Sequence, residues 1–284
     1  MRAAVVALGV LGCEAPEEIL GVAYDERWGE RTTMDVYLPA GGSSPDPAVL
    51  LIHGGGWAYG SKEVVQDAAR RFARSGFAAV AINYRLVPDH PWPAAAQDAV
   101  CALSFLRANA DEWNVDPDRI AVMGYSAGGH LSALLAVAAD DPAIAADCDA
   151  GPTGLPAAAV PAAFNPDFRG EDADLVQDFL GGSEDEIPEV YEIASPITHV
   201  RPGLPPFLFV HGEDDVVDIG GSIEMRGLLR QAGNEANMLV VEGGGYLLNP
   251  SAEGGDQQLA VADDAPESWL AIVDFLDRTI GKDR

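Results

Sequence analysis

The stretch Gly124-Tyr125-Ser126-Ala127-Gly128-Gly129 decides how the rest of the chain is interpreted. It has the G-x-S-x-G form of a nucleophile elbow, in which a serine sits on a strained turn between a strand and a helix. The run 119–124 before the serine is typical of a strand, and the run 130–139 after it is typical of a helix. Glycines flank the serine because a side chain at either place would crowd the turn. The motif predicts a catalytic Ser126, with a plain glycine-rich turn as the alternative.

The composition is that of a globular protein with an unusual charge balance. Of 284 residues, 48% are hydrophobic and 22% charged, but 45 Asp and Glu stand against 17 Lys and Arg, for a formal net charge of -28. Such a surface repels nucleic acid and anionic lipid, so we do not expect binding to either through surface charge. An acidic excess with little lysine also suits high-salt or acidic surroundings, where counter-ions screen the repulsion. An acidic solvated shell without a specific role is the alternative.

Three cysteines, Cys13, Cys101 and Cys148, are too few and too scattered to indicate a metal site or a disulfide framework. Cys101 lies inside a helical pattern, and we interpret it as a small buried hydrophobic residue. Cys13 ends Val10-Leu11-Gly12-Cys13, which occupies the place of a bacterial lipobox after a short apolar run. Residues 1–20 are therefore expected to be an N-terminal segment. It is either the lipoprotein-type signal of an exported protein, with a membrane tether at Cys13, or an unstructured start of a cytoplasmic protein.

Short apolar strands alternate with helical patterns along most of the chain. Two strands at 22–24 and 33–38, joined by a polar turn, predict an antiparallel edge. Further strands are expected at 48–52, 77–82, 120–123, 207–210 and 238–242, and helices around 64–75, 94–110, 130–139, 223–232 and 268–279. This alternation predicts an α/β fold with a mostly parallel sheet and helices on both faces.

No internal repeat or long linker interrupts the pattern, so residues 21–284 are predicted to form a single domain. One part departs from the regular alternation, at about 140–205, where Pro, Gly and acidic residues are frequent. Within it, 155–160 is a candidate strand and 172–180 a candidate helix. A long irregular insertion beside a catalytic sheet is often a substrate-facing lid, and loosely packed surface is the alternative.

A second glycine motif, His53-Gly54-Gly55-Gly56-Trp57, directly follows the predicted strand at 48–52. Consecutive glycines expose backbone N–H groups that a substrate oxygen can approach, as in the H-G-G-G loop of esterases and lipases. We expect the N–H groups of Gly55, Gly56 and Ala127 to form an oxyanion hole. Because both motifs follow strands and occur in this order, they favour a hydrolase.

With these motifs the chain resembles the α/β hydrolases, in the group that joins hormone-sensitive-lipase-like esterases with bacterial feruloyl-esterase-like and acetyl-esterase carboxylesterases. The resemblance runs from about 35 to 276 and rests on Asp35-Val-Tyr-Leu-Pro39, Ile82-Asn-Tyr-Arg-Leu86, Pro93-Ala-Ala-Ala-Gln-Asp98, Asp116-Pro-Asp-Arg-Ile120, Ala194-Ser-Pro-Ile197 and Pro205-Pro-Phe-Leu-Phe-Val-His-Gly212. It implies the α/β hydrolase fold and an acyl-enzyme mechanism on small esters, without a metal or organic cofactor. Arg85 and Asp98 are expected to be structural, and His53 to brace the glycine loop.

The resemblance also assigns the acid and the base of a catalytic triad. The acid falls on Asp215, in the pattern H-G-x-x-D, with Asp214 as a weaker candidate. The base, a histidine after the last strand in the family, falls on Tyr246 here. The five histidines of the chain all precede Asp215, at His53, His90, His130, His199 and His211. A neutral phenol, with an ordinary pKa of about 10, is a poor proton acceptor at pH 7.

Without the histidine we expect very low activity. Loss of a triad histidine costs on the order of 10⁶ in kcat, whereas the hole and binding alone leave roughly 10³ to 10⁴ over water. The chain is then a natural non-catalytic relative, a protein whose histidine was replaced deliberately, or an enzyme with another base such as His130 or His199. Lys62, which follows the glycine loop, is the cation that could lower a tyrosine pKa.

Two functions follow from these residues. The first is a serine carboxylesterase for acetyl, feruloyl or short-chain esters, impaired by Tyr246 at the base position. The second is a non-catalytic ligand-binding homologue of such an enzyme. Trp57 and Tyr125 are weak candidates for substrate binding, as are Tyr59 and Phe164, although aromatic residues beside a sheet more often belong to the core. The sequence leaves the ester and the oligomeric state open.

Overall fold

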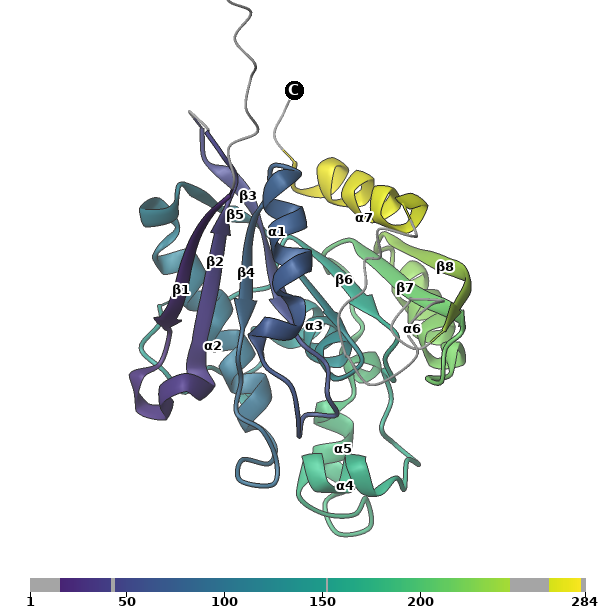
Figure 1. Cartoon of the computed structure of the whole chain (residues 1–284). Coiled ribbons are helices and arrows are strands. Elements are labelled where there is room, and N and C mark those ends of the chain that lie inside the picture. Colours follow the sequence, from purple (N-terminus) through teal and green to yellow (C-terminus); the bar gives the residue numbers. More distant parts are fainter. Residues whose placement is uncertain (1–15, 42–43, 152, 246–265, 282–284) are drawn as a thin grey trace, which may run out of the picture.

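The computed structural model describes residues 16–41, 44–151, 153–245 and 266–281. In this part of the chain one sheet has the strand order β1-β2-β4-β3-β5-β6-β7-β8 (Figure 1). β2 pairs antiparallel with β1 and with β4, and the remaining pairs are parallel. The strands are β1 (Glu17–Ala23), β2 (Thr33–Leu38), β3 (Asp46–Ile52), β4 (Ala78–Ile82), β5 (Val115–Tyr125), β6 (Ala158–Ala162), β7 (Phe207–Asp214) and β8 (Ala236–Gly245). The predicted parallel sheet with an antiparallel edge is confirmed.

Helices cover both faces of the sheet, as predicted. On one face lie α1 (Gln66–Arg74) and α7 (Pro266–Thr279), and on the other lie α2 (Ala94–Ala108), α3 (Ala127–Ala138) and α6 (Ile219–Gln231) (Figure 1). Two short helices, α4 (Asp174–Leu180) and α5 (Pro188–Ala194), lie beyond the carboxyl ends of the parallel strands, at the bottom of Figure 1. The 3₁₀ helices are η1 (Glu26–Thr32), η2 (Lys62–Val65), η3 (Ala110–Trp113), η4 (Pro142–Ile144) and η5 (Pro196–His199).

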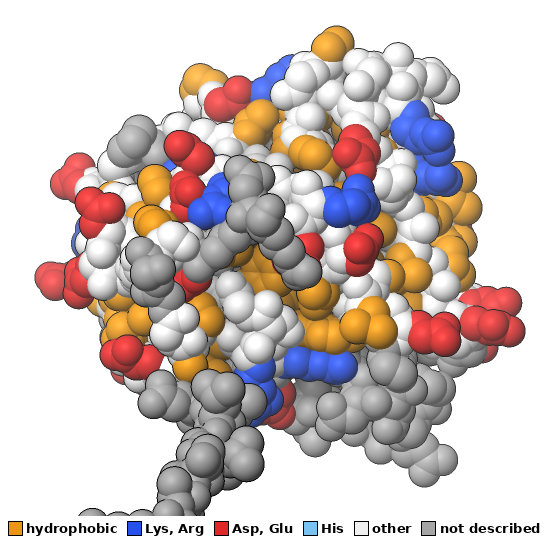
Figure 2. All heavy atoms as spheres, turned by 90° about the horizontal axis from the view of Figure 1, so that it is seen from above, with side chains coloured by type: hydrophobic (Ala, Val, Ile, Leu, Met, Phe, Trp, Pro, Cys, Tyr) orange, Lys and Arg blue, Asp and Glu red, His pale blue; other side chains and the backbone are white. Residues whose placement is uncertain are grey.

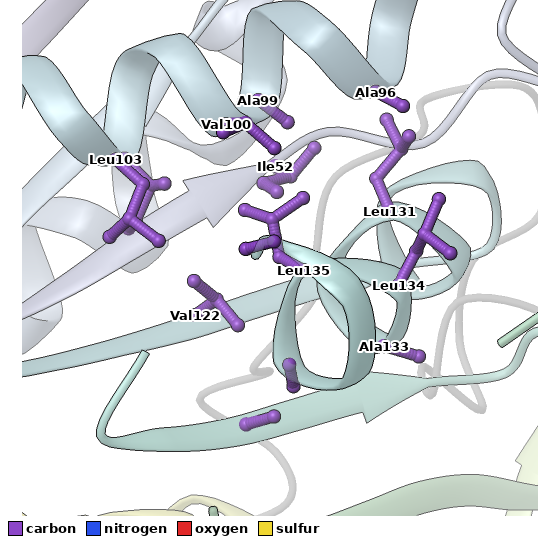
Figure 3. Packing of buried hydrophobic residues seen from close by; sticks show 14 of the residues in the cluster. Ile52, Ala96, Ala99, Val100, Leu103, Val122, Leu131, Ala133, Leu134 and Leu135 are labelled. Carbon is purple, nitrogen blue, oxygen red and sulfur yellow. The ribbon is translucent and has the colours of Figure 1, made fainter. Parts of the chain in front are cut away.

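The sheet separates two hydrophobic cores because side chains alternate between its faces. In β3, Leu50 and Ile52 belong to the core under α2 and α3, whereas Val49 and Leu51 belong to the core under α1 and α7. Figure 3 shows Ile52 near the side chains of α2 and α3. All residues of α3 are buried, which explains why its sequence is apolar on every side. The helix that follows Ser126 is therefore enclosed by other parts of the protein along its whole length.

The segment at about 140–205 is more regular than we expected. The candidate strand at 155–160 is β6, which lies between β5 and β7 in the centre of the sheet, and the candidate helix at 172–180 is α4. Only the part after β6 lies outside the sheet layers, where α4 and α5 are placed. The expectation of one irregular insertion is corrected in this respect, because β6 is a structural element of the sheet.

The N-terminal boundary also differs from the expected one. β1 begins at Glu17, so residues 17–20 of the expected N-terminal segment belong to this strand, and residues 17–19 pair with β2. Cys13 and the proposed lipobox lie outside the described residues. Within the described residues, no helix has the length and apolar character needed to cross a membrane.

Cys101 and Cys148 form a disulfide, with their Cα atoms 6.1 Å apart. Cys101 is buried in the core, as expected, but the expectation that the scattered cysteines form no disulfide is wrong. The bond connects α2 to the loop after η4, which the sequence places 47 residues later. That loop also lines a pocket of about 620 Å³ together with Tyr24, Arg27 and Phe105.

Charged side chains are scattered over the face that lies opposite α4 and α5. Figure 2 shows acidic and basic groups there, interspersed with hydrophobic ones. The net charge of -28 is thus not gathered into a single patch on this face.

Candidate active site

Ser126 lies between β5 and α3, at the carboxyl end of the sheet, as the motif predicts. Its backbone has φ 54° and ψ -119°, a conformation that non-glycine residues rarely adopt. Hydrogen bonds hold this backbone on both sides. The Ser126 N–H donates to the carbonyl oxygen of Ala162 in β6 at 2.9 Å, and its carbonyl accepts from the His130 N–H at 2.9 Å. The sheet and the first turn of α3 therefore maintain the strained turn.

The glycines around Ser126 are required by close backbone approaches. A Cβ atom added to Gly124 would overlap the carbonyl group of Gly128. A Cβ atom on Gly128 would overlap the carbonyl oxygen of Ile52, at the end of β3. The elbow is thus pressed against the start of the glycine loop, and larger residues would separate the two motifs.

The glycine loop passes directly beside the serine. A Cβ atom on Gly54 would lie 3.5 Å from the Cβ of Ser126. Gly55 and Gly56 have φ 115° and 57°, so both occupy the region that favours glycine. Within the described residues, the backbone N–H groups of Gly55, Gly56 and Ala127 donate no hydrogen bond. Unoccupied N–H donors beside a nucleophile can receive a developing oxyanion. The oxyanion hole of Gly55, Gly56 and Ala127 stays a prediction.

His53 braces the glycine loop, as we expected. Its Nδ1 lies 2.7 Å from the carbonyl oxygen of Gly54, which fixes Nδ1 as the protonated nitrogen. The ring stacks on Tyr84 with centroids 4.3 Å apart, and the Tyr84 hydroxyl donates to the His53 carbonyl oxygen at 2.9 Å. Burial lowers the pKa of His53 to about 4. The ring is therefore neutral at pH 7 and acts as a structural support.

Asp215 follows β7 and lies close to the elbow. Its Oδ2 accepts from the Tyr125 hydroxyl at 3.3 Å, and its Oδ1 accepts from the Val217 N–H at 3.0 Å. Burial raises the pKa of Asp215 above its ordinary value. Asp214, by contrast, ends β7 with its side chain exposed. The geometry therefore favours Asp215 as the acid that stands near Ser126.

Tyr125 has a contact that the sequence did not indicate. We expected it as a weak candidate for substrate binding, but its ring is buried and its hydroxyl reaches the carboxylate of Asp215. The residue before the serine and the residue after β7 are 90 positions apart, so no local pattern reveals the pair. Tyr125 therefore connects the nucleophile turn to the acid loop.

The base position lies outside the described residues. β8 pairs with β7 up to the register of Gly245 with Asp214, and Tyr246 is the next residue in the sequence. The assignment of Tyr246 to the base position therefore stays a prediction from the resemblance. The sequence contains no histidine after His211.

The two histidines considered as substitute bases bind backbone carbonyl groups of other segments. Nε2 of His130 lies 2.7 Å from the oxygen of Ala194 in α5, and Nε2 of His199 lies 2.8 Å from the oxygen of Ile193. Burial lowers the pKa of His130 to about 4. Both rings hold α5 in place, which favours a structural role over proton transfer at Ser126.

Lys62, the cation considered for lowering a tyrosine pKa, is paired with carboxylates away from Asp215. Lys62 lies 3.3 Å from carboxylate oxygens of both Asp35 and Glu63. Burial opposes the charge of Lys62, but the two carboxylates raise its pKa above the ordinary value. Asp35 belongs to β2, which lies toward one edge of the sheet, whereas β7 and β8 lie at the other edge. Lys62 therefore does not lie beside the acid loop.

Arg85 and Asp98 form a buried bidentate pair and are structural, as expected.

The remaining aromatic candidates belong mainly to the core. Trp57 is buried and stacks on Phe179 of α4, with ring centroids 4.2 Å apart and an interplanar angle of 12°. Phe164 is buried against Phe209, whereas Tyr59 is 72% exposed. Trp57 thus connects the glycine loop to α4. Among the described residues, no cluster of three or more His, Cys, Asp or Glu side chains could hold a metal ion.

Comparisons with known proteins agree with this geometry. The family model BD-FAE matches residues 34–229, a range that ends in α6 and does not include position 246. Esterase LipC of Mycobacterium tuberculosis is 35% identical over 184 residues, which are 62% of this chain and 46% of LipC. Carboxylesterase NlhH of the same species is 43% identical over 107 residues, 37% of this chain and 34% of NlhH. The chain therefore spans less than half the length of these relatives.

Solved structures share the fold over nearly the whole chain. Esterase 2 of Thermogutta terrifontis superposes with a TM-score of 0.74 at 25% identity, covering 95% of this chain and 96% of that structure. A bifunctional GH43-CE protein of Bacteroides eggerthii superposes with a TM-score of 0.77 at 26% identity, covering 93% of this chain and 38% of that protein. The predicted α/β hydrolase fold is confirmed.

Proposed function

The chain belongs to the BD-FAE family, and from this premise we propose that it is a serine hydrolase of small acyl esters. One observation carries the proposal. Ser126 occupies a strained turn with φ 54° beside Gly54 of the glycine loop. The backbone N–H groups of Gly55, Gly56 and Ala127, which follow Gly54 and Ser126 in the chain, donate to no other group in the described residues. A strained serine next to preorganised donors is the arrangement that acyl transfer requires.

In the proposed reaction Ser126 Oγ attacks the ester carbonyl carbon, and the carbonyl oxygen becomes an oxyanion held by the three N–H groups. The C–O bond to the alcohol then breaks, and the alcohol leaves with a proton. Water attacks the acyl-enzyme in the same way, which releases the carboxylic acid and restores Ser126. Both steps need a base that takes a proton and returns it, and Asp215 would orient that base.

The position of the base limits the activity that we propose. Tyr246 takes the place of histidine, and the alternatives His130 and His199 bind the carbonyl groups of α5. Turnover by the chain is therefore expected to be very low. The absence of a histidine from the base position also favours a second candidate function. In this function the chain binds an ester or its product beside Ser126 without turnover.

We also propose that the protein is exported and that Cys13 tethers it to a membrane. The disulfide between Cys101 and Cys148 supports export, because disulfides form and persist in oxidising compartments and are rare in the cytosol. Acetyl, feruloyl and short-chain esters are the substrates considered.

The test is to replace Tyr246→His and to measure hydrolysis of p-nitrophenyl acetate and butyrate. We expect a gain of at least about 10³-fold in kcat over the native chain, because a triad histidine contributes several orders of magnitude. The double variant Tyr246→His with Ser126→Ala is the control and should lose the gain. If Tyr246→His brings no increase, position 246 is not the base position.

The binding function predicts another result. The native chain should then show a ligand-dependent rise in Tm with uncharged ester analogues, without release of p-nitrophenol. Turnover by the native chain that disappears in Ser126→Ala would exclude this second function.

A further inference from the structure

Leu175, in α4, lies against the glycine loop. A Cβ atom added to Gly56 would lie 2.9 Å from Leu175 Cδ1 and 3.2 Å from Leu175 Cδ2. No atom fits between the two residues, since even one methyl group would be closer than ordinary van der Waals contact. The other side of the Leu175 side chain remains accessible, with 46% of the residue exposed. Leu175 thus forms an apolar wall beside Gly56, one of the three residues of the predicted oxyanion hole.

The position of this wall is fixed by the rest of α4. Phe179, one helical turn after Leu175, stacks on Trp57 at 4.2 Å, and its carbonyl oxygen accepts from the Trp92 N–H at 2.8 Å. Val176 and Leu180 are buried as well. Moving the backbone of α4 away from the glycine loop would require Phe179 to leave Trp57, which is the residue next to Gly56. The backbone that carries Leu175 is therefore held beside the loop.

The contact of α5 with the nucleophile helix adds to this rigidity. Nε2 of His130 donates to the carbonyl oxygen of Ala194, at the end of α5. The ring of His130 also contacts Phe168 and Phe179, with centroids 4.7 Å and 5.7 Å apart. The segment with α4 and α5 is thus attached both to the glycine loop and to α3.

We propose that Leu175 limits the size of the acyl group that the site accepts, so that short alkyl acyl groups fit and longer or rigid ones such as feruloyl do not. The inference rests on the proposed function, because it places the ester carbonyl oxygen at the N–H of Gly56. A hydrogen bond there brings the oxygen within about 3 Å of that nitrogen. The neighbouring acyl carbons then come within contact distance of Leu175, about 4 Å. An apolar wall suits an alkyl chain rather than a polar alcohol such as a sugar.

The test compares Leu175→Ala with Leu270→Ala as the matched control. Leu270 lies in α7, on the other face of the sheet, and is 62% exposed. In the Tyr246→His background, kcat/KM is measured for p-nitrophenyl acetate, butyrate and hexanoate. We expect the ratio of hexanoate to acetate to rise roughly 10-fold or more in Leu175→Ala, since one methylene in an apolar pocket already changes specificity by about that factor. The ratio should stay unchanged in Leu270→Ala.

A second measurement does not depend on turnover. Binding of acetamide, butyramide and hexanamide to the native chain and to both leucine variants is measured by calorimetry, because these uncharged analogues are not repelled by the acidic surface. Leu175→Ala should shift the preference toward hexanamide by a similar factor, and Leu175→Phe should shift it toward acetamide. If the binding preference shifts in this way but no variant hydrolyses an ester, the proposed hydrolase function is refuted. The proposal that Leu175 limits the size of the acyl group then still holds. An unchanged preference, an equal change in Leu270→Ala, or no binding of any analogue overturns the inference.

Discussion

Removal of the disulfide should lower stability by an amount that follows from its place in the chain. Cys101 and Cys148 are 47 residues apart. In the chain-entropy treatment, a cross-link that closes a loop of this length stabilises the folded state by about 4 kcal/mol at 25 °C. For a chain of 284 residues, an unfolding entropy of about 2.1 cal/mol/K per residue converts this free energy into a fall in Tm of about 7 °C.

The assay has two parts. Thiol titration of the denatured, unreduced protein, produced without lipid modification, should find one free thiol, that of Cys13. Thermal unfolding should then show the expected fall in Tm when dithiothreitol is added, and the double variant Cys101→Ala/Cys148→Ala should not respond to dithiothreitol. Cys13→Ser is the control, since it removes the remaining thiol and should respond to dithiothreitol as the native chain does. Three free thiols in the native chain, or a Tm that dithiothreitol leaves unchanged, would refute the pairing and its contribution to stability.

Two further predictions concern pH and the elbow. Burial lowers the pKa of His53 and His130 to about 4 in the folded chain, below the ordinary value of about 6.5. Because the unfolded chain then binds more protons between these two values, the free energy of unfolding is highest above pH 6.5 and falls as the pH drops toward 4. The loss reaches up to about 3 kcal/mol for each histidine. Urea unfolding at pH 7.5 and pH 5 measures this loss, and equal stability at both values would contradict the burial of the rings. Gly128→Ala should cost more than about 4 kcal/mol, because its Cβ would overlap the carbonyl oxygen of Ile52. The control Gly227→Ala, which has open space in α6, should change stability by less than about 1 kcal/mol, and equal effects of the two variants would mean that the elbow is looser than described.

Local patterns were sufficient for the elbow, the glycine loop and the order of strands and helices. A glycine beside a strained serine, or an apolar run of five residues, reflects constraints on neighbouring atoms, and these constraints can be recognised from adjacent residues alone. Asp215 was assigned by the resemblance to the esterases, through the pattern H-G-x-x-D, and its role as the acid stays a prediction.

The tertiary structure decided which distant residues meet. The pairing of Cys101 with Cys148, the hydroxyl of Tyr125 on Asp215 and the side chain of Leu175 on Gly56 each join separate segments. The place of β6 in the sheet also required the structure, because the sequence offers 155–160 as a candidate strand but does not show that it pairs with β5 on one side and β7 on the other.

The strained turn at Ser126 and the glycines around it were therefore determined by the sequence itself, since they depend on residue type and close spacing. The catalytic roles of Ser126 and Asp215 stay predictions. The surroundings of Ser126 were decided only by the fold. The wall over Gly56 and the partner of Asp215 depend on how α4 and β7 pack against the elbow, and packing between segments that are far apart leaves no periodic signal in either one.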